Sequence, residues 1–159
     1  MIKANTDNNS ANSFKDEEKA VLGTNKMTAL ELMKQGGSYK CGWDQSQNGS
    51  TSNIIVYIDG QMLRQEMKMK TPTIDIESSI LVKDGYQYSW NSMTPGIATR
   101  TRMVENTGIY LKPNTPASSM EVTLAGLDEQ AQAPGYSCQS WTADASIFTP
   151  PANVKFVGN

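Results

Sequence analysis

The 159-residue sequence contains no histidine, and this absence removes the most common forms of catalytic chemistry. Histidine is the usual base that activates a serine or cysteine nucleophile, and it is a frequent ligand of zinc. Ser-His, Cys-His and His-metal sites are therefore excluded. A glycine-rich phosphate loop is also missing, because Gly36-Gly37 follows an expected helix instead of preceding one. We expect a protein that is not an enzyme and that uses no cofactor and no metal.

An excess of positive charge and long apolar runs are missing as well. Lysine and arginine number 14 against 16 acidic residues, and a net charge of -2 makes nucleic acid an unexpected partner. No apolar run approaches the roughly 18 residues that a membrane helix needs. The start, Met1-Ile2-Lys3, carries no signal peptide, which leaves a native cytoplasmic start or the mature domain of an exported protein. We favour the exported domain because the rest of the chain has an extracytoplasmic character.

Only two cysteines are present, Cys41 and Cys138, and they form no CxxC pattern of a redox or zinc site. Two buried thiols and one disulfide are both open interpretations. The aromatic-flanked, strand-like segments 39–43 and 136–141 favour a disulfide, which closes a loop of about 100 residues and contributes about 4–5 kcal/mol. Such a bond implies an oxidising compartment, the periplasm or the cell surface.

Polarity divides the chain into a tether and one domain. Residues 1–27 are rich in Asn, Ser, Thr and charged side chains, and we predict a disordered or marginally helical tether. Residues 28–159 suit a single β-rich domain. This domain begins with a capping box from Thr28 to Glu31, which predicts a short helix ended by Gly36-Gly37.

Period-two alternation then predicts an antiparallel meander of about six strands, with one apolar and one charged face. Asp59-Gly60 and Asp84-Gly85 indicate tight hairpin turns, and residues 45–52 are predicted to be a turn region. Further on, we expect a helix over residues 118–132, a strand at Cys138, a helical turn before Pro150-Pro151 and a last strand over residues 154–156. The predicted fold class is mainly β (α+β), an antiparallel meander sheet curved into a half-barrel and covered by one to three short helices.

Large apolar side chains of the sheet region are the candidate ligand-binding residues. Nine methionines are many for this length, and Met67 and Met69 project to one side. A plain core, an adaptable apolar pocket and a Cu(I) site are the open interpretations. The stripe of tyrosines and tryptophan after Gly85 suits a packed face or a surface that stacks on a sugar or an acyl chain. The candidates are Leu63, Met67, Met69, Ile80, Tyr86, Tyr88, Trp90 and Met103.

Charged residues of the strands are expected to face water. Asp75 and Glu77 are adjacent carboxylates, but a solvated surface is the better interpretation, and a hydrolase requires carboxylates that converge in a cleft. Arg100 and Arg102, with two lysines of an earlier strand, suit either a membrane-facing strip or a solvated face that protects a sheet edge.

Several short motifs within residues 36–157 suggest a family resemblance. They are Cys41-Gly42-Trp43, residues 56–60, Leu63-Arg64, Asp84-Gly85 with its aromatic stripe, and the pattern Cys138-x-x-Trp141-x-x-Asp144-x-Ser146-x-Phe148-x-x-Pro151-x-x-Val154-x-Phe156. With these motifs the chain resembles a family of small exported, lipoprotein-like proteins of reduced-genome bacteria. The lipobox cysteine of an anchored member is absent. In architecture alone, the sheet and its lid are similar to the LolA and LppX type of periplasmic carriers, which implies a bound acyl chain.

Two functions from different classes follow from these observations. The first is a non-enzymatic extracytoplasmic binding protein that holds an apolar or lipid-like ligand between sheet and helices, with peripheral membrane association through an N-terminal lipid anchor missing from this chain. The alternative is a cell-surface interaction, adhesive or envelope-assembly module without a small-molecule ligand, which uses an exposed sheet edge or an aromatic patch.

Overall fold

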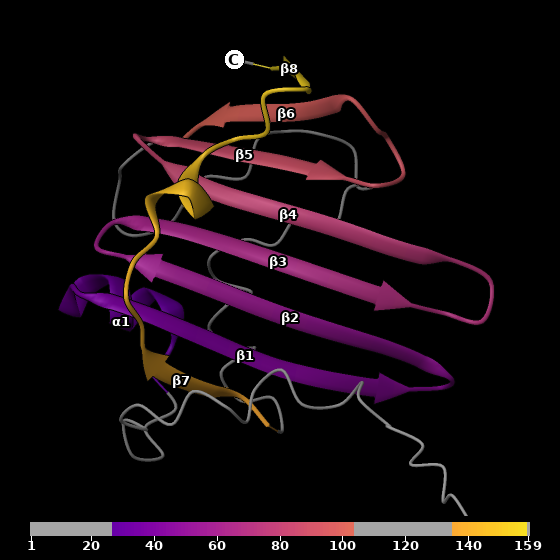
Figure 1. Cartoon of the computed structure of the whole chain (residues 1–159), viewed down its shortest axis with the longest axis horizontal. Coiled ribbons are helices and arrows are strands. Elements are labelled where there is room, and N and C mark those ends of the chain that lie inside the picture. The colour runs from indigo at the N-terminus through magenta and orange to yellow at the C-terminus, as the bar shows by residue number, and fades with distance from the viewer. Residues whose placement is uncertain (1–26, 104–134, 159) are drawn as a thin grey trace, which may run out of the picture.

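The computed structural model describes residues 27–103 and 135–158, which form one eight-stranded sheet with a short helix at one end (Figure 1). The strand order is β7-β1-β2-β3-β4-β5-β6-β8. The elements are α1 (Ala29–Gln35), β1 (Ser38–Gln47), β2 (Ser50–Asp59), β3 (Met62–Lys70), β4 (Asp75–Lys83), β5 (Tyr86–Asn91), β6 (Ile97–Arg102), β7 (Ser137–Ser140), the 3-10 helix η1 (Ala145–Phe148) and β8 (Lys155–Val157).

Strands β1 to β6 form the predicted antiparallel meander, and three of their connections are two-residue turns. Asp84-Gly85 is confirmed as a tight turn, with φ of 53° and 77° in the left-handed region that primed hairpin turns need. In the hairpin before it, Asp59 pairs with Met62, so the loop is Gly60-Gln61. The predicted turn region over residues 45–52 is wrong. Strands β1 and β2 continue to Gln47 and Ser50, because Asn48-Gly49 makes the turn with φ of 51° and 76°.

Helix α1 begins at the predicted capping box. The Thr28 hydroxyl accepts a hydrogen bond from the Glu31 amide at 3.2 Å, and the Glu31 carboxylate accepts one from the Thr28 amide at 2.8 Å. Gly36, with φ of 75°, ends the helix and donates to the carbonyls of Leu32 and Met33. A seven-residue helix has little stability alone, so the burial of Leu32 and Met33 against the sheet is what holds it.

The C-terminal segment pairs with both edges of the meander. Strand β7 lies antiparallel to β1, and β8 lies parallel to β6 at the opposite edge. Residues 141–154, which we call the strap, cross one side of the sheet between these two strands and include η1 (Figure 1). The predicted helical turn and terminal strand are confirmed, whereas the parallel pairing of β8 was not predicted.

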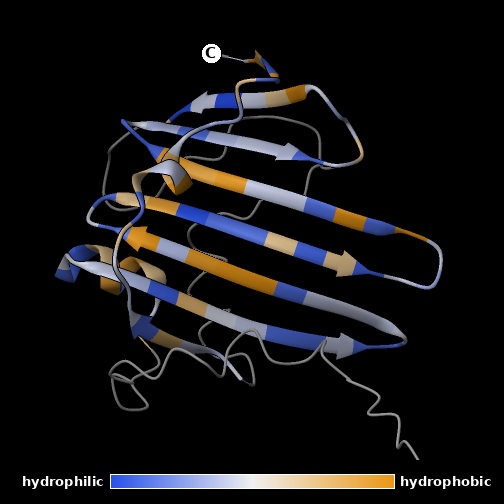
Figure 2. Cartoon of the chain, viewed as in Figure 1, coloured by the Kyte–Doolittle hydropathy of each residue, from blue (hydrophilic) through white to orange (hydrophobic). Residues whose placement is uncertain are grey.

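Alternation along the strands gives the sheet two different sides. The methionine side includes Cys41, Ile54, Leu63, Met67 and Ile80, and with α1 it holds the main buried cluster. The strap side carries Tyr57, Arg64, Leu81, Tyr88, Arg100 and their neighbours in register. Figure 2 shows apolar stretches along β2 and β4 with hydrophilic positions along β3 between them.

The predicted fold class is confirmed, since the chain forms a mainly β, curved, largely antiparallel sheet with few helices. The helix predicted over residues 118–132 lies outside the described residues. The predicted tether also lies outside them, apart from Met27, which packs against the main cluster.

Candidate functional site

The eight candidate residues divide between the two sides of the sheet. Leu63 is buried in the main cluster, Met67 and Met103 pack against it, and Met69 and Ile80 lie on the same side in register. The aromatic residues Tyr86, Tyr88 and Trp90 all lie on the strap side. The reason is the two-residue turn at Asp84-Gly85. It pairs Lys83 with Tyr86, so Tyr86 shares the side of Lys83, while Val82 faces the other way.

Burial on the methionine side varies along the strands. Beside α1, Leu63 and Ile58 are fully buried, whereas Met67 and Met69 further along β3 are half-buried. Ile76 and Ile80 on β4 retain 8% and 9% exposure. Methionine side chains are flexible and polarisable, so they adapt to irregular or variable apolar neighbours. This part of the sheet is therefore suited to contact with an apolar molecule.

Within the part of the chain that the structure describes, two buried polar atoms on this side lack hydrogen-bond partners. Gln65 is 3% exposed and lies between Val56 and Ile80, and its side-chain carbonyl accepts no hydrogen bond. Trp43 is 2% exposed, and its indole N–H donates none. A buried polar group without a partner costs about 1–3 kcal/mol. Gln65 was not among the predicted candidate residues, although a glutamine in phase with Leu63 and Met67 on one strand face was a usable signal.

The predicted disulfide lies on this side and joins β1 to the edge strand β7. Cys41 bonds to Cys138, 97 residues away along the chain, and no described cysteine is free. Next to it, the Tyr136 ring packs on Trp43 with 5.4 Å between ring centroids. The Tyr136 hydroxyl donates to the Met27 carbonyl at 2.9 Å, and it lies 3.1 Å from the Cys138 sulfur. These contacts join the start of the described chain, at Met27, to the segment that leads into β7 at one edge of the sheet.

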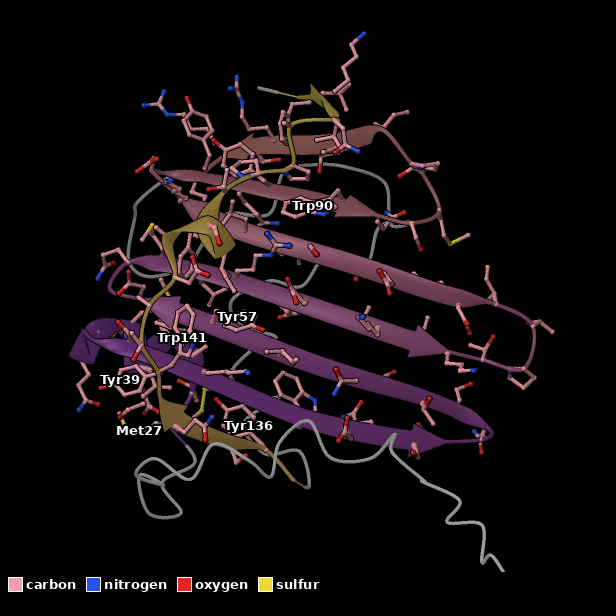
Figure 3. All side chains as sticks on the ribbon, viewed as in Figure 1. Met27, Tyr39, Tyr57, Trp90, Tyr136 and Trp141 are labelled. Atoms are coloured by element: carbon pink, nitrogen blue, oxygen red, sulfur yellow. A yellow bond between two sulfur atoms is a disulfide. The ribbon has the colours of Figure 1, made fainter. Side chains whose placement is uncertain are left out.

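The strap is held to its side of the sheet by aromatic packing and by one arginine. Phe148 is 1% exposed, and Trp141 packs between Phe148 and Tyr57 with centroid distances of 6.2 and 5.3 Å (Figure 3). Arg64 donates to the Ile147 carbonyl at 3.0 Å and pairs with Glu66 at 3.0 Å. Burial, and then the Glu66 carboxylate, raise the pKa of Tyr57, and the positive charge of Arg64 opposes them.

Beyond the strap, the same side carries a group of aromatic rings and arginines. The Arg64 guanidinium lies 4.9 Å from the centroid of Trp90, and that of Arg100 lies 5.0 Å from Tyr86. Tyr88 contacts Tyr86 at 6.3 Å and Phe156 at 5.4 Å between centroids. The predicted aromatic stripe is therefore a cation–π array on the outer strands of the sheet.

No family model matches this chain, and no curated protein or solved structure matches it either. Within residues 27–103 and 135–158, acidic and cysteine side chains form no group of three that could hold a metal ion. Helices in the same part of the chain are too short and too polar to cross a membrane. The candidate sites are thus two surfaces, one on each side of a disulfide-linked β-sheet.

Proposed function

We propose that this protein is a non-enzymatic binding protein of an extracytoplasmic compartment, and that its methionine side holds an apolar or lipid-like ligand. The disulfide supports the compartment, because such bonds persist where the environment is oxidising. The ligand class is supported by the apolar side chains that share this side, some of which, such as Met67 and Met69, are incompletely buried.

The observation that carries the proposal is the buried carbonyl of Gln65, which lies between the apolar residues Val56 and Ile80 and has no hydrogen-bond partner among the described residues. A structural core has no use for such a group, since leucine or methionine fills the same volume without the cost of an unmade hydrogen bond. In a binding site, by contrast, such a group has a role, because ligand sites are mostly apolar with a few polar groups that orient the ligand.

The two unpaired atoms also define the ligand chemistry. The Gln65 carbonyl accepts, so it selects a hydroxyl, amide or protonated carboxyl group; the Trp43 N–H donates, so it selects an oxygen. An amphipathic molecule with one polar end and a hydrocarbon chain meets both requirements, and Met67 and Met69 accommodate chains of different shape.

Binding of a fluorescent long-chain fatty acid to matched variants of β3 tests the proposal. Met67→Gln and Lys68→Gln place the same residue at neighbouring positions that face opposite sides of the sheet. We expect Met67→Gln to weaken binding about tenfold, since it adds polar atoms to the apolar contact. Lys68→Gln should bind like the original protein. Equal binding by all three proteins would refute the assignment of this side.

A further inference from the structure

Two arginines and two tyrosines on the outer strands of the strap side form a surface that the proposed ligand site does not use. The arginine–tyrosine surface consists of Tyr86 and Tyr88 of β5 and Arg100 and Arg102 of β6. Arg100 lies directly opposite Tyr88, and Arg102 lies directly opposite Tyr86. The tyrosines are half-buried and the arginines are exposed.

Positive charge is concentrated here although the chain as a whole is slightly acidic. Strands β5 and β6 contain two cationic residues, Arg100 and Arg102, which share this side, and no acidic residue, against a net charge of -2 for the protein. Lys83 of β4, the strand on the other flank of β5, pairs with Tyr86 in register and adds a cation on the same face of the sheet. The tyrosine is thus flanked by positive charge on both neighbouring strands.

The guanidinium groups of this surface are available to a partner. Among the described residues, neither Arg100 nor Arg102 takes part in an ion pair, and the Arg100 guanidinium lies over the Tyr86 ring, 5.0 Å from its centroid. Arg64 differs, because its donors already hold Glu66 and the strap. Stacking on an aromatic ring fixes a guanidinium while its N–H fork still points outward, and that fork binds carboxylates in pairs of hydrogen bonds.

The tyrosine rings are held in place for contact with a flat partner. Tyr88 packs edge-on against Phe156 of β8 at 5.4 Å and against Tyr86 at 6.3 Å. Rings presented by paired strands lose little conformational freedom on binding, so their apolar faces are ready to receive the C–H face of a sugar ring.

We propose that the arginine–tyrosine surface binds an acidic polysaccharide, with uronate carboxylates on Arg100 and Arg102 and sugar rings against Tyr86 and Tyr88. A membrane fits less well, because each basic residue near an anionic bilayer contributes only about 1 kcal/mol and the rings need flat partners. Single-stranded nucleic acid shares the stacking chemistry, but the acidic chain and its disulfide disfavour it. The protein would then hold an envelope polymer on one side of the sheet and its apolar ligand on the other.

Affinity electrophoresis of the intact, disulfide-bonded protein in gels containing polygalacturonate tests this inference. Arg100→Gln/Arg102→Gln is compared with Lys68→Gln/Lys70→Gln, which removes the same charge from the same side of the sheet on β3. We expect the arginine variant to lose at least about tenfold in affinity, as the loss of one charged hydrogen-bonding group predicts. The lysine variant should change less than about twofold, because exposed charges at a distance are screened.

A third variant separates stacking from charge. Tyr88→Leu keeps every charge and should still weaken retardation by polygalacturonate, and neutral dextran should not retard any of the proteins. Equal losses in the two double variants, no effect of Tyr88→Leu, or tighter binding to oligodeoxythymidylate or to phosphatidylglycerol vesicles would each overturn the inference.

Discussion

Cys41 and Cys138 lie directly opposite each other on β1 and β7, with their Cα atoms 4.0 Å apart. The bond joins the first strand of the meander to the strand from which the strap departs. It therefore fixes one end of a segment whose other end, β8, pairs with the far edge of the sheet. Since Cys41 is fully buried beside Val56, the same bond also belongs to the main cluster.

Removal of the disulfide should cost much of the stability of the domain. For a loop of 97 residues, the chain-entropy model predicts a loss of about 4–5 kcal/mol in the free energy of unfolding of Cys41→Ala/Cys138→Ala. Urea unfolding of the variant and of the oxidised protein measures this difference. Thiol titration of the unfolded, unreduced protein should find no reactive cysteine, and two reactive thiols would contradict the disulfide.

The packing of the strap on the sheet should depend on Phe148 more than on any other side chain of η1. Phe148→Ala removes a ring that is 1% exposed and packed against Trp141, so we expect a loss of about 3–5 kcal/mol. Ile74→Ala serves as the control, because Ile74 is 41% exposed and its truncation should cost less than about 0.5 kcal/mol. A similar small loss in both variants, measured by urea unfolding, would show that the strap does not pack as described.

Much of this fold could be predicted because local signals and register agree. The alternation of Leu63, Met67 and Met69 with charged residues marked β3, and Asp84-Gly85 marked the turn between β4 and β5. The extension of β1 and β2 to Asn48-Gly49 was missed because their ends are polar on both sides and carry no alternation. The parallel pairing of the three-residue β8 depends on the path of the strap, which no local pattern encodes.

The candidate site was predicted less well, because the side of the sheet on which the aromatic residues lie depends on the number of residues in the Asp84-Gly85 turn. Residues that flank a two-residue hairpin loop pair with each other and share a side of the sheet. Tyr86 therefore lies on the side of Lys83 and not on the side of Val82. Counting across this turn places the aromatic stripe opposite the methionines, and the sequence alone contains that information. The missing partner of Gln65 is different, because only packing in three dimensions shows that the carbonyl is buried and unpaired.

Replacement of Gln65 should stabilise the ligand-free protein. Gln65→Met keeps the length of the side chain and removes the unpaired carbonyl, so the free energy of unfolding should rise by about 1 kcal/mol. Gln87→Met is the control on the same side of the sheet, where the half-buried glutamine should give little gain. A loss of stability in Gln65→Met would mean that this carbonyl has a partner within the protein.

Acid should affect the start of η1 only at unusually low pH. Hydrogen bonds from the side chain and then the backbone of Ser146 lower the pKa of Asp144. A lowered pKa in the folded state means that this stabilisation is present above the ordinary aspartate pKa and is lost as the pH falls through the lower, folded value. Carbon-detected NMR should show Asp144 titrating below the ordinary value, and Ser146→Ala should move the titration upward. An unchanged titration in that variant would mean that the Ser146 hydroxyl does not lower this pKa.

Native mass spectrometry tests the central claim, ligand binding on the methionine side, most directly. The disulfide-bonded protein is extracted with organic solvent, returned to buffer, incubated with a total lipid extract and desalted before measurement, in parallel with Met67→Gln and Lys68→Gln. We predict a one-to-one complex with a lipid-like molecule for the original protein and for Lys68→Gln, and a much smaller fraction of this complex for Met67→Gln. The polypeptide mass alone in the original protein, or equal lipid binding by all three proteins, would contradict the claim.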